Sequence, residues 1–296
     1  MSIFTGAGVA IVTPMKANGE INYDKLAELL DYQINNSTDA IVICGTTGES
    51  ATMTEKEHIE AIRFTADYVK KRVPVVAGTG SNCTKTAVEL SKEAQAAGVD
   101  GCLVVTPYYN KTSQRGLIQH YTTIADAVDI PMILYNVPGR TGLNISVDTV
   151  VELAKHKNIQ AMKDATDNIA YAMEVLAKTA DLDFDLYSGC DDNILPFMAA
   201  GGKGVISVTS NLYPEAVEKL TQLILKGNIK EAQPLAYALD PISRLLFIDV
   251  NPIMPKAALA KMGVCGECLR LPLITTTDEN KKALFDAMEE FEKLGY

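Results

Sequence analysis

Eight short apolar segments, rich in β-branched residues, recur through the first two thirds of the chain. Segments with helical periodicity lie between them, for example at 23–35, 55–71, 85–97 and 114–128, with Asn22 and Thr84 expected as N-terminal caps. We expect strands at 9–13, 40–44, 74–78, 102–106, 132–136, 159–163, 184–188 and 205–208. Such a repeat predicts parallel βαβ units, and eight units favour a closed (β/α)8 TIM barrel over an open, doubly wound sheet.

The last third of the chain has a different pattern, of helices without strands. These are expected at 215–226, 229–247, 255–262 and 278–294. We therefore expect a catalytic barrel at residues 1–226 and a C-terminal helical extension at 227–296. Because no linker-like composition separates the two parts, the extension should pack on the barrel.

The composition excludes several classes of partner. The chain of 296 residues has a formal net charge of −10, which argues against nucleic-acid binding and against an anionic membrane surface. No stretch approaches the roughly 20 apolar residues of a membrane span, and the N-terminus lacks the basic start of a signal peptide. We expect a soluble cytoplasmic protein with reduced cysteines, and we interpret Cys265 and Cys268, the only CxxC pair, as part of an incidental surface loop.

Polar residues gather directly after several expected strands, where a TIM barrel carries its active site. The segments concerned are GTTGES at 45–50, TPYYN at 106–110, YNVPGRTG at 135–142, KDAT at 163–166 and SGCDD at 188–192. The strand bodies are Val, Ile, Leu and Ala. Polar groups over an apolar floor are typical of a ligand site.

Lys163 is the only lysine within the expected strands. Alternation along a strand places Ile159, Ala161 and Lys163 on one face and Asp164 on the other. If that face is the barrel interior, Lys163 is partly desolvated, which favours the neutral amine that attacks a carbonyl group. The alternative is an ordinary ion pair with Asp164 at the strand edge.

Three other features admit both a functional and a structural interpretation. Tyr135 either relays protons beside Lys163 or packs as a half-buried aromatic residue. The glycine-containing loop at 45–49 either turns its N–H groups toward a small carboxylate or is a plain turn. Arg140 either grips a second carboxylate or is a solvated loop residue.

Two kinds of chemistry are disfavoured. The three histidines form no metal-binding motif, so we expect no metal site. A phosphate site is expected after strands seven and eight of a barrel, but Asp191 and Asp192 follow the seventh strand here. The substrate is therefore expected to be unphosphorylated.

Taken together, GTTGES, YNVPGRTG and the KDA of the sixth strand resemble the pyruvate-dependent class I aldolase and lyase family that includes dihydrodipicolinate synthase and N-acetylneuraminate lyase. The likeness is strongest to the dihydrodipicolinate synthase branch. It rests there on three further features: the arginine in GRTG, the segment VTPYYN and the segment NPIMPKAAL. The resemblance implies condensation of pyruvate with L-aspartate 4-semialdehyde, followed by cyclisation, in diaminopimelate and lysine biosynthesis. Another pyruvate-releasing lyase of this family, acting on N-acetylneuraminate or a 2-keto-3-deoxy sugar acid, is the alternative.

The resemblance also implies roles for individual residues. Lys163 would form a Schiff base with pyruvate. Tyr135, Thr46 and Tyr109 would form a proton relay, with Tyr109 supplied by a neighbouring subunit of a homotetramer built as a dimer of dimers. Thr47 and the backbone of Ile206 would hold pyruvate, Arg140 would hold the carboxylate of the aldehyde substrate, and Gly189 would be a further substrate-binding position.

A candidate allosteric lysine site is implied at Ser50, Ala51, His58, Asn82 and Tyr108. In family members that respond to lysine, a glutamate that pairs with the effector's ammonium group stands where this chain has Thr86. A histidine or lysine is common where this chain has Glu55. Loss of a charge-assisted hydrogen bond weakens binding by roughly 1.5–3 kcal/mol, so we expect weak or absent inhibition by lysine.

Overall fold

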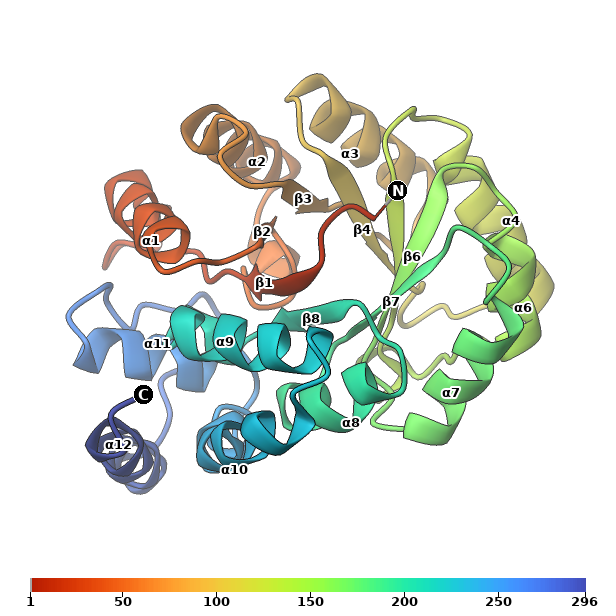
Figure 1. Ribbon diagram of the computed structural model, residues 1–296. Helices are drawn as coiled ribbons and strands as arrows, with labels where there is room; N and C mark the ends of the chain where they lie inside the picture. Colours follow the sequence, from red (N-terminus) through yellow and green to blue (C-terminus); the bar gives the residue numbers. More distant parts are fainter. Residues whose placement is uncertain (1) are drawn as a thin grey trace.

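Eight parallel strands close into a barrel in the order β1 to β8, with helices around the outside (Figure 1). The structure, a computed structural model, describes residues 2–296. Each strand is followed by a helical segment before the next strand, which confirms the predicted TIM barrel. The strands are β1 Gly6–Ala10, β2 Ala40–Ile43, β3 Val75–Gly78, β4 Gly101–Val105, β5 Met132–Asn136, β6 Ile159–Asp164, β7 Asp185–Ser188 and β8 Gly204–Ser207.

Nine α-helices lie within or directly after the eight βα units of the described chain, and three more follow. The first group is α1 Tyr23–Asn35, α2 Glu55–Val69, α3 Thr84–Ala96, α4 Gln114–Ala125, α5 Pro138–Thr141, α6 Val147–Leu153, α7 Ile169–Lys178, α8 Ile194–Ala199 and α9 Pro214–Leu225. The C-terminal helices are α10 Ile229–Leu245, α11 Ile253–Lys261 and α12 Asp278–Lys293. Short 3-10 turns lie at Ser50–Thr52, Asp191–Asn193 and Thr209–Asn211.

Two apolar layers stabilise the barrel. A large outer cluster joins the strands to the surrounding helices. A smaller inner cluster fills the barrel and includes Val42, Ile133, Tyr135, Ala161 and Ile206. Alternate residues of each strand point into these two layers, as expected for strands covered on both faces.

The sixth strand departs from the predicted alternation. Ala161 belongs to the inner layer and Lys163 follows on the same face, as predicted, but Ile159 belongs to the outer cluster. The prediction for Ile159 is wrong because the register shifts here: Met132 of β5 pairs with Ile159, whereas the next residue pairs with Ala161. One residue is left over, and it turns Ile159 to the opposite face.

Two local expectations are corrected near helix and strand ends. Strand β1 begins at Gly6, not at residue 9. Its first residues, Gly6, Ala7 and Gly8, have low strand propensity, so the sequence pattern missed them, but they pair with β8. It ends at Ala10, after which the N–H of Val12 donates to the side chain of Asn211. Thr84 is the first residue of α3 and not its cap, and its hydroxyl bonds to the ring of His120. The cap at Asn22 is confirmed.

The C-terminal extension packs on one side of the barrel. Helix α10 contacts α8, α9 and α12, and α11 contacts α12 and the 3-10 turn after β8 (Figure 1). Cys265, expected in a surface loop, is buried in this extension, and burial raises the pKa of its thiol to about 11. We keep the boundary between residues 226 and 227 as our proposed division. Within residues 2–296, no helix has the length and apolarity to cross a membrane.

Candidate active site

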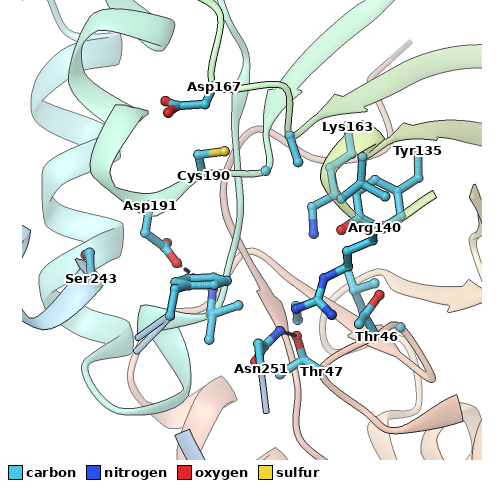
Figure 2. A pocket seen from close by; sticks show the side chains of 18 of the residues that line it. Thr46, Thr47, Tyr135, Arg140, Lys163, Asp167, Cys190, Asp191, Ser243 and Asn251 are labelled. Carbon is cyan, nitrogen blue, oxygen red and sulfur yellow. Dashed lines mark hydrogen bonds between the residues drawn. The ribbon is translucent and has the colours of Figure 1, made fainter. Parts of the chain in front are cut away.

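A cavity of about 380 Å³ opens at the carboxyl ends of the barrel strands. Six of the residues predicted from the sequence line it, and they come from the ends of β5 and β6 and from the segments that follow β2, β5 and β7. These residues are Thr46, Thr47, Tyr135, Arg140, Lys163 and Gly189. Figure 2 shows Lys163, Tyr135 and Arg140 together on one side of the pocket, with Thr46 and Thr47 below them.

Lys163 is the last residue but one of β6 and is only 5% exposed. It is paired with Tyr135 in the register of β5 and β6, and its Nζ lies 4.6 Å from the centroid of the Tyr135 ring. The ion-pair alternative fails, because the carboxylate of Asp164 accepts from the N–H and hydroxyl of Thr166 instead. Burial raises the pKa of Asp164 to about 6. Lys163 is thus an amine over an apolar floor, facing the cavity.

The loop at residues 45–49 is a tight turn at the mouth of β2. The N–H of Gly48 donates to the carbonyl of Gly45, and the Thr13 hydroxyl donates to the carbonyl of Gly48 at 2.8 Å. A Cβ on Gly48 would lie 3.2 Å from the backbone of Cys44, so this turn favours glycine. The turn presents the side chains of both threonines to the cavity.

The wall opposite Arg140 includes residues of the SGCDD segment, which was expected at the barrel mouth, but no catalytic or binding role was predicted for Asp167, Cys190, Asp191 or Asp192. Asp167, Cys190 and Asp191 lie there (Figure 2), and Asp192 also lines the cavity. Asp191 has a structural role, because one of its oxygens accepts from the backbone N–H groups of Val208 and Thr209. Burial raises the pKa of the Cys190 thiol to about 12, so the thiol stays protonated.

Residues of the C-terminal extension also line the cavity: Ser243, Arg244, Phe247 and Asn251. The Nδ2 of Asn251 donates to the hydroxyl of Thr47 at 2.9 Å (Figure 2). The sequence carried one signal for this connection. Asn251 stands in the NPIMPKAAL segment, whose Lys256 is the only charged residue among eight otherwise apolar or small residues at 253–260.

Two predicted residues lie away from the cavity in the single chain. The side chain of Ile206 is buried in the inner layer of the barrel, and the role of its backbone in holding pyruvate stays a prediction. Tyr109 is 93% exposed and has a left-handed backbone (φ 68°). Tyr109 therefore points to solvent in one copy of the chain.

The residues of the candidate lysine site gather around a second cavity, of about 410 Å³. Ser50, Ala51 and His58 line it together with Glu55, Thr86 and Tyr108. Asn82 lies beside it and donates to the carbonyl of Tyr108. The ring of His58 bonds to the carbonyl of Gly78 at 2.7 Å, and burial lowers its pKa. Thr46 and Arg140 line both cavities, so the two are neighbours.

Known proteins share both this sequence and this fold. The profile of the dihydrodipicolinate synthetase family matches residues 3–291. The 4-hydroxy-tetrahydrodipicolinate synthase of Lachnoclostridium phytofermentans is 55% identical over 291 residues, which cover 98% of this chain and 99% of that protein. The same enzyme name belongs to a Geobacter sulfurreducens protein that is 51% identical over 98% of this chain and 99% of its own length.

Solved structures agree with the sequence matches. The crystal structure of dihydrodipicolinate synthase DapA-2 from Bacillus anthracis has a TM-score of 0.94 and 43% identity, covering 98% of this chain and 99% of that chain. A match of this extent in both sequence and fold leaves one assignment: the chain belongs to the dihydrodipicolinate synthetase family.

Proposed function

We propose that this chain is a class I aldolase-type lyase that condenses pyruvate with L-aspartate 4-semialdehyde and yields 4-hydroxy-tetrahydrodipicolinate, the reaction named for its relatives. The observation that supports this most directly is the buried Lys163 at the end of β6, beside Tyr135 and facing the cavity. A desolvated amine in such a position is suited to attack a ketone. The reaction needs no metal or organic cofactor.

The first half-reaction activates pyruvate. The Nζ of Lys163 adds to the keto carbon, and loss of water gives an iminium. The iminium withdraws electrons from the adjacent methyl group, which loses a proton to form an enamine. Tyr135 would take part in these proton transfers through its phenol, since its ring lies directly beside the Nζ of Lys163. The loop at 45–49 and the Thr47 hydroxyl would hold the pyruvate carboxylate.

The second half-reaction forms the new carbon–carbon bond. The enamine carbon attacks the aldehyde, whose oxygen takes a proton from the Tyr135 relay. Arg140 would hold the carboxylate of the aldehyde substrate, because a guanidinium binds a carboxylate in a bidentate manner. The substrate's own amine then attacks the iminium carbon and expels Lys163. One water is released in the overall condensation, and the enzyme amine is regenerated.

We further propose that the working unit contains at least two copies of the chain, assembled as a tetramer of two dimers. Tyr109 supports this, since a fully exposed aromatic residue with a strained backbone is suited to enter a neighbouring copy. We also propose a cytoplasmic location, because all six cysteines are free, as in a reducing compartment.

Borohydride trapping tests the chemistry at Lys163. Treatment with pyruvate and borohydride should add a pyruvate-derived mass to the peptide that contains Lys163. The variant Lys163→Met should lose this adduct and lose turnover by a factor of at least 10³. As a matched control, Lys261→Met removes a lysine of α11 that pairs with Glu289 at the surface, and it should retain both. An active enzyme with an unmodified Lys163 would contradict the proposal.

The choice of aldehyde is tested separately. A coupled assay should show turnover of pyruvate with aspartate semialdehyde that exceeds cleavage of N-acetylneuraminate. Arg140 is the reason, because a polyol substrate calls for neutral hydrogen-bonding groups at that position. Faster cleavage of N-acetylneuraminate would favour the alternative lyase activity.

A further inference from the structure

The loop at residues 45–49 has an internal hydrogen bond from Gly48 to Gly45, but it also has a strained residue at each end. Cys44 (φ 56°) precedes it and Glu49 (φ 57°) ends it, both in the left-handed region. A non-glycine residue keeps such a backbone only where its surroundings impose it. The residues that contact this loop are therefore a guide to what controls the two threonines.

Lys256 of α11 makes the strongest of these contacts. Its side chain is 0% exposed, and its Nζ forms an ion pair with the equally buried carboxylate of Glu49. The same Nζ donates to the carbonyl of Cys268 at 2.7 Å, and the N–H of Arg270 donates to Glu49 at 3.1 Å. The C-terminal extension thus holds the end of the loop through a buried ion pair, each member of which has a further hydrogen bond.

Asn251 makes the contact nearest to the substrate. Its Nδ2 donates to the Oγ1 of Thr47 at 2.9 Å, and the pair is buried in the wall of the cavity. A hydroxyl that accepts a hydrogen bond from one side keeps its own proton for another acceptor. In this cavity the acceptor that the proposed function supplies is the carboxylate of pyruvate.

We propose that Asn251 and Lys256 are positioning residues for pyruvate binding. Asn251 keeps the Thr47 hydroxyl proton directed to the substrate carboxylate, and Lys256 fixes the loop through Glu49. The catalytic site is thereby completed by the C-terminal extension and not by the barrel alone. This inference rests on the proposed function, and its tests follow pyruvate binding at Lys163 without the second substrate.

The first experiment reverses the polarity of the Asn251 contact. In Asn251→Asp a carboxylate accepts from Thr47, so the hydroxyl no longer donates to pyruvate. The concentration of pyruvate that half-saturates borohydride trapping should rise at least tenfold in Asn251→Asp and less in Asn251→Ala, which leaves the hydroxyl free to rotate. The effect of Asn251→Asp should shrink at least threefold in a Thr47→Val background.

Two results would overturn the role of Asn251. A merely structural residue would make Asn251→Ala, which leaves a cavity, the more harmful change. Simple repulsion of pyruvate by the new charge would give the same effect in the Thr47→Val background. Failure of the proposed function has a different signature, since the unaltered protein would then form no pyruvate adduct at Lys163.

The second experiment separates positioning by Lys256 from its role in stability. Lys256→Met alone leaves the Glu49 carboxylate buried and unpaired, so it is paired with Glu49→Gln in a double variant that removes the charge as well. The double variant should melt within a few degrees of the unaltered protein, yet need at least five times more pyruvate for half-saturation. The rate of trapping of the double variant at saturating pyruvate should change by a smaller factor than its half-saturating pyruvate concentration. Lys261→Met, on the same helix, should change neither quantity. A stable double variant with unaltered pyruvate dependence would refute the role of Lys256.

Discussion

At the scale of single residues, two nearly buried lysines show how surroundings decide between structure and chemistry. Lys256 is fixed by Glu49 and by the carbonyl of Cys268. Lys163 faces a cavity, and the neighbouring Asp164 bonds to Thr166 rather than to the lysine. A paired buried cation stabilises a packing arrangement, whereas the amine of Lys163 faces a cavity that can admit a substrate.

Asp164 gives a prediction about stability and pH. Burial raises its pKa from 3.8 to about 6, so between these values the folded protein binds the proton more tightly than the unfolded chain. Ionisation of Asp164 therefore lowers stability as the pH rises through this window, and the full loss is present above about pH 6. Asp164→Asn should raise the free energy of unfolding by about 2–3 kcal/mol at pH 7.5, and this gain should disappear near pH 4.

Urea unfolding at pH 7.5, 5.5 and 4.0 measures this difference. The exposed Asp181 is the matched control, and Asp181→Asn should give no pH-dependent change relative to the unaltered protein. A gain of equal size at all three pH values would contradict the assignment to ionisation of Asp164.

Thr86 gives a prediction about regulation. It lines the second cavity with Glu55 and His58. Its side chain carries no negative charge to pair with the ammonium group of lysine. We expect an inhibition constant for lysine well above the millimolar range. Thr86→Glu should lower it by a factor of 10 to 100, which corresponds to roughly 1.5–3 kcal/mol. Lys85→Glu, at an exposed neighbouring position, is the control for added charge. Sub-millimolar inhibition of the unaltered enzyme would sink this prediction.

At the scale of elements, the sequence predicted well what short-range chemistry determines. The bounds of β5 and α1 agree with the structure, because an apolar β-branched run and the Asn22 cap define them locally. The predicted orientation of Ile159 was wrong, because a register shift depends on the neighbouring strand. The wall formed by α10 was missed, because nothing in an amphipathic pattern tells which strand ends a helix will cover.

The start of α2 gives a prediction at this scale. Thr54 and Glu57 form a capping box, in which each side chain bonds to the other's backbone N–H. Thr54→Ala should lower the free energy of unfolding by about 1 kcal/mol, as for other caps. Thr123→Ala, on the exposed face of α4, should change it by less than about 0.5 kcal/mol. Equal effects in chemical denaturation would show that the box adds nothing.

At the scale of the whole molecule, the site is shared between distant parts of the chain and, in our proposal, between copies. Thr47 and Asn251 are 204 residues apart, yet they are bonded. No periodicity or spacing carries such a pairing, so the sequence predicted the residues of the barrel mouth but not their supports. Tyr109 was predicted as a relay residue only through the family resemblance, and a single copy leaves it exposed.

Mixing of subunits tests the proposed role of Tyr109. Lys163→Met and Tyr109→Phe should each be impaired alone, the first at least 10³-fold and the second about tenfold to a hundredfold. Hybrids of Lys163→Met with the double variant Lys163→Met/Tyr109→Phe contain no Lys163 and should stay inactive, so they serve as the negative control. In hybrids of Lys163→Met with Tyr109→Phe, the subunit that keeps Lys163 receives an unaltered Tyr109 from its partner. Up to half of the sites are then complete, so up to half of the unaltered enzyme's activity should return. No recovery in verified hybrids would place Tyr109 outside the relay.

The contacts of Asn251, Lys256 and Arg270 with the loop after β2 also set an order of events during synthesis. The loop leaves the ribosome early, but the residues that hold it are made some two hundred positions later. A nascent or truncated chain that stops before residue 251 already contains Lys163 and the loop, yet lacks Asn251, Lys256 and Arg270. In our proposal, the supports of the loop after β2 are therefore added to the barrel only when the chain is nearly complete.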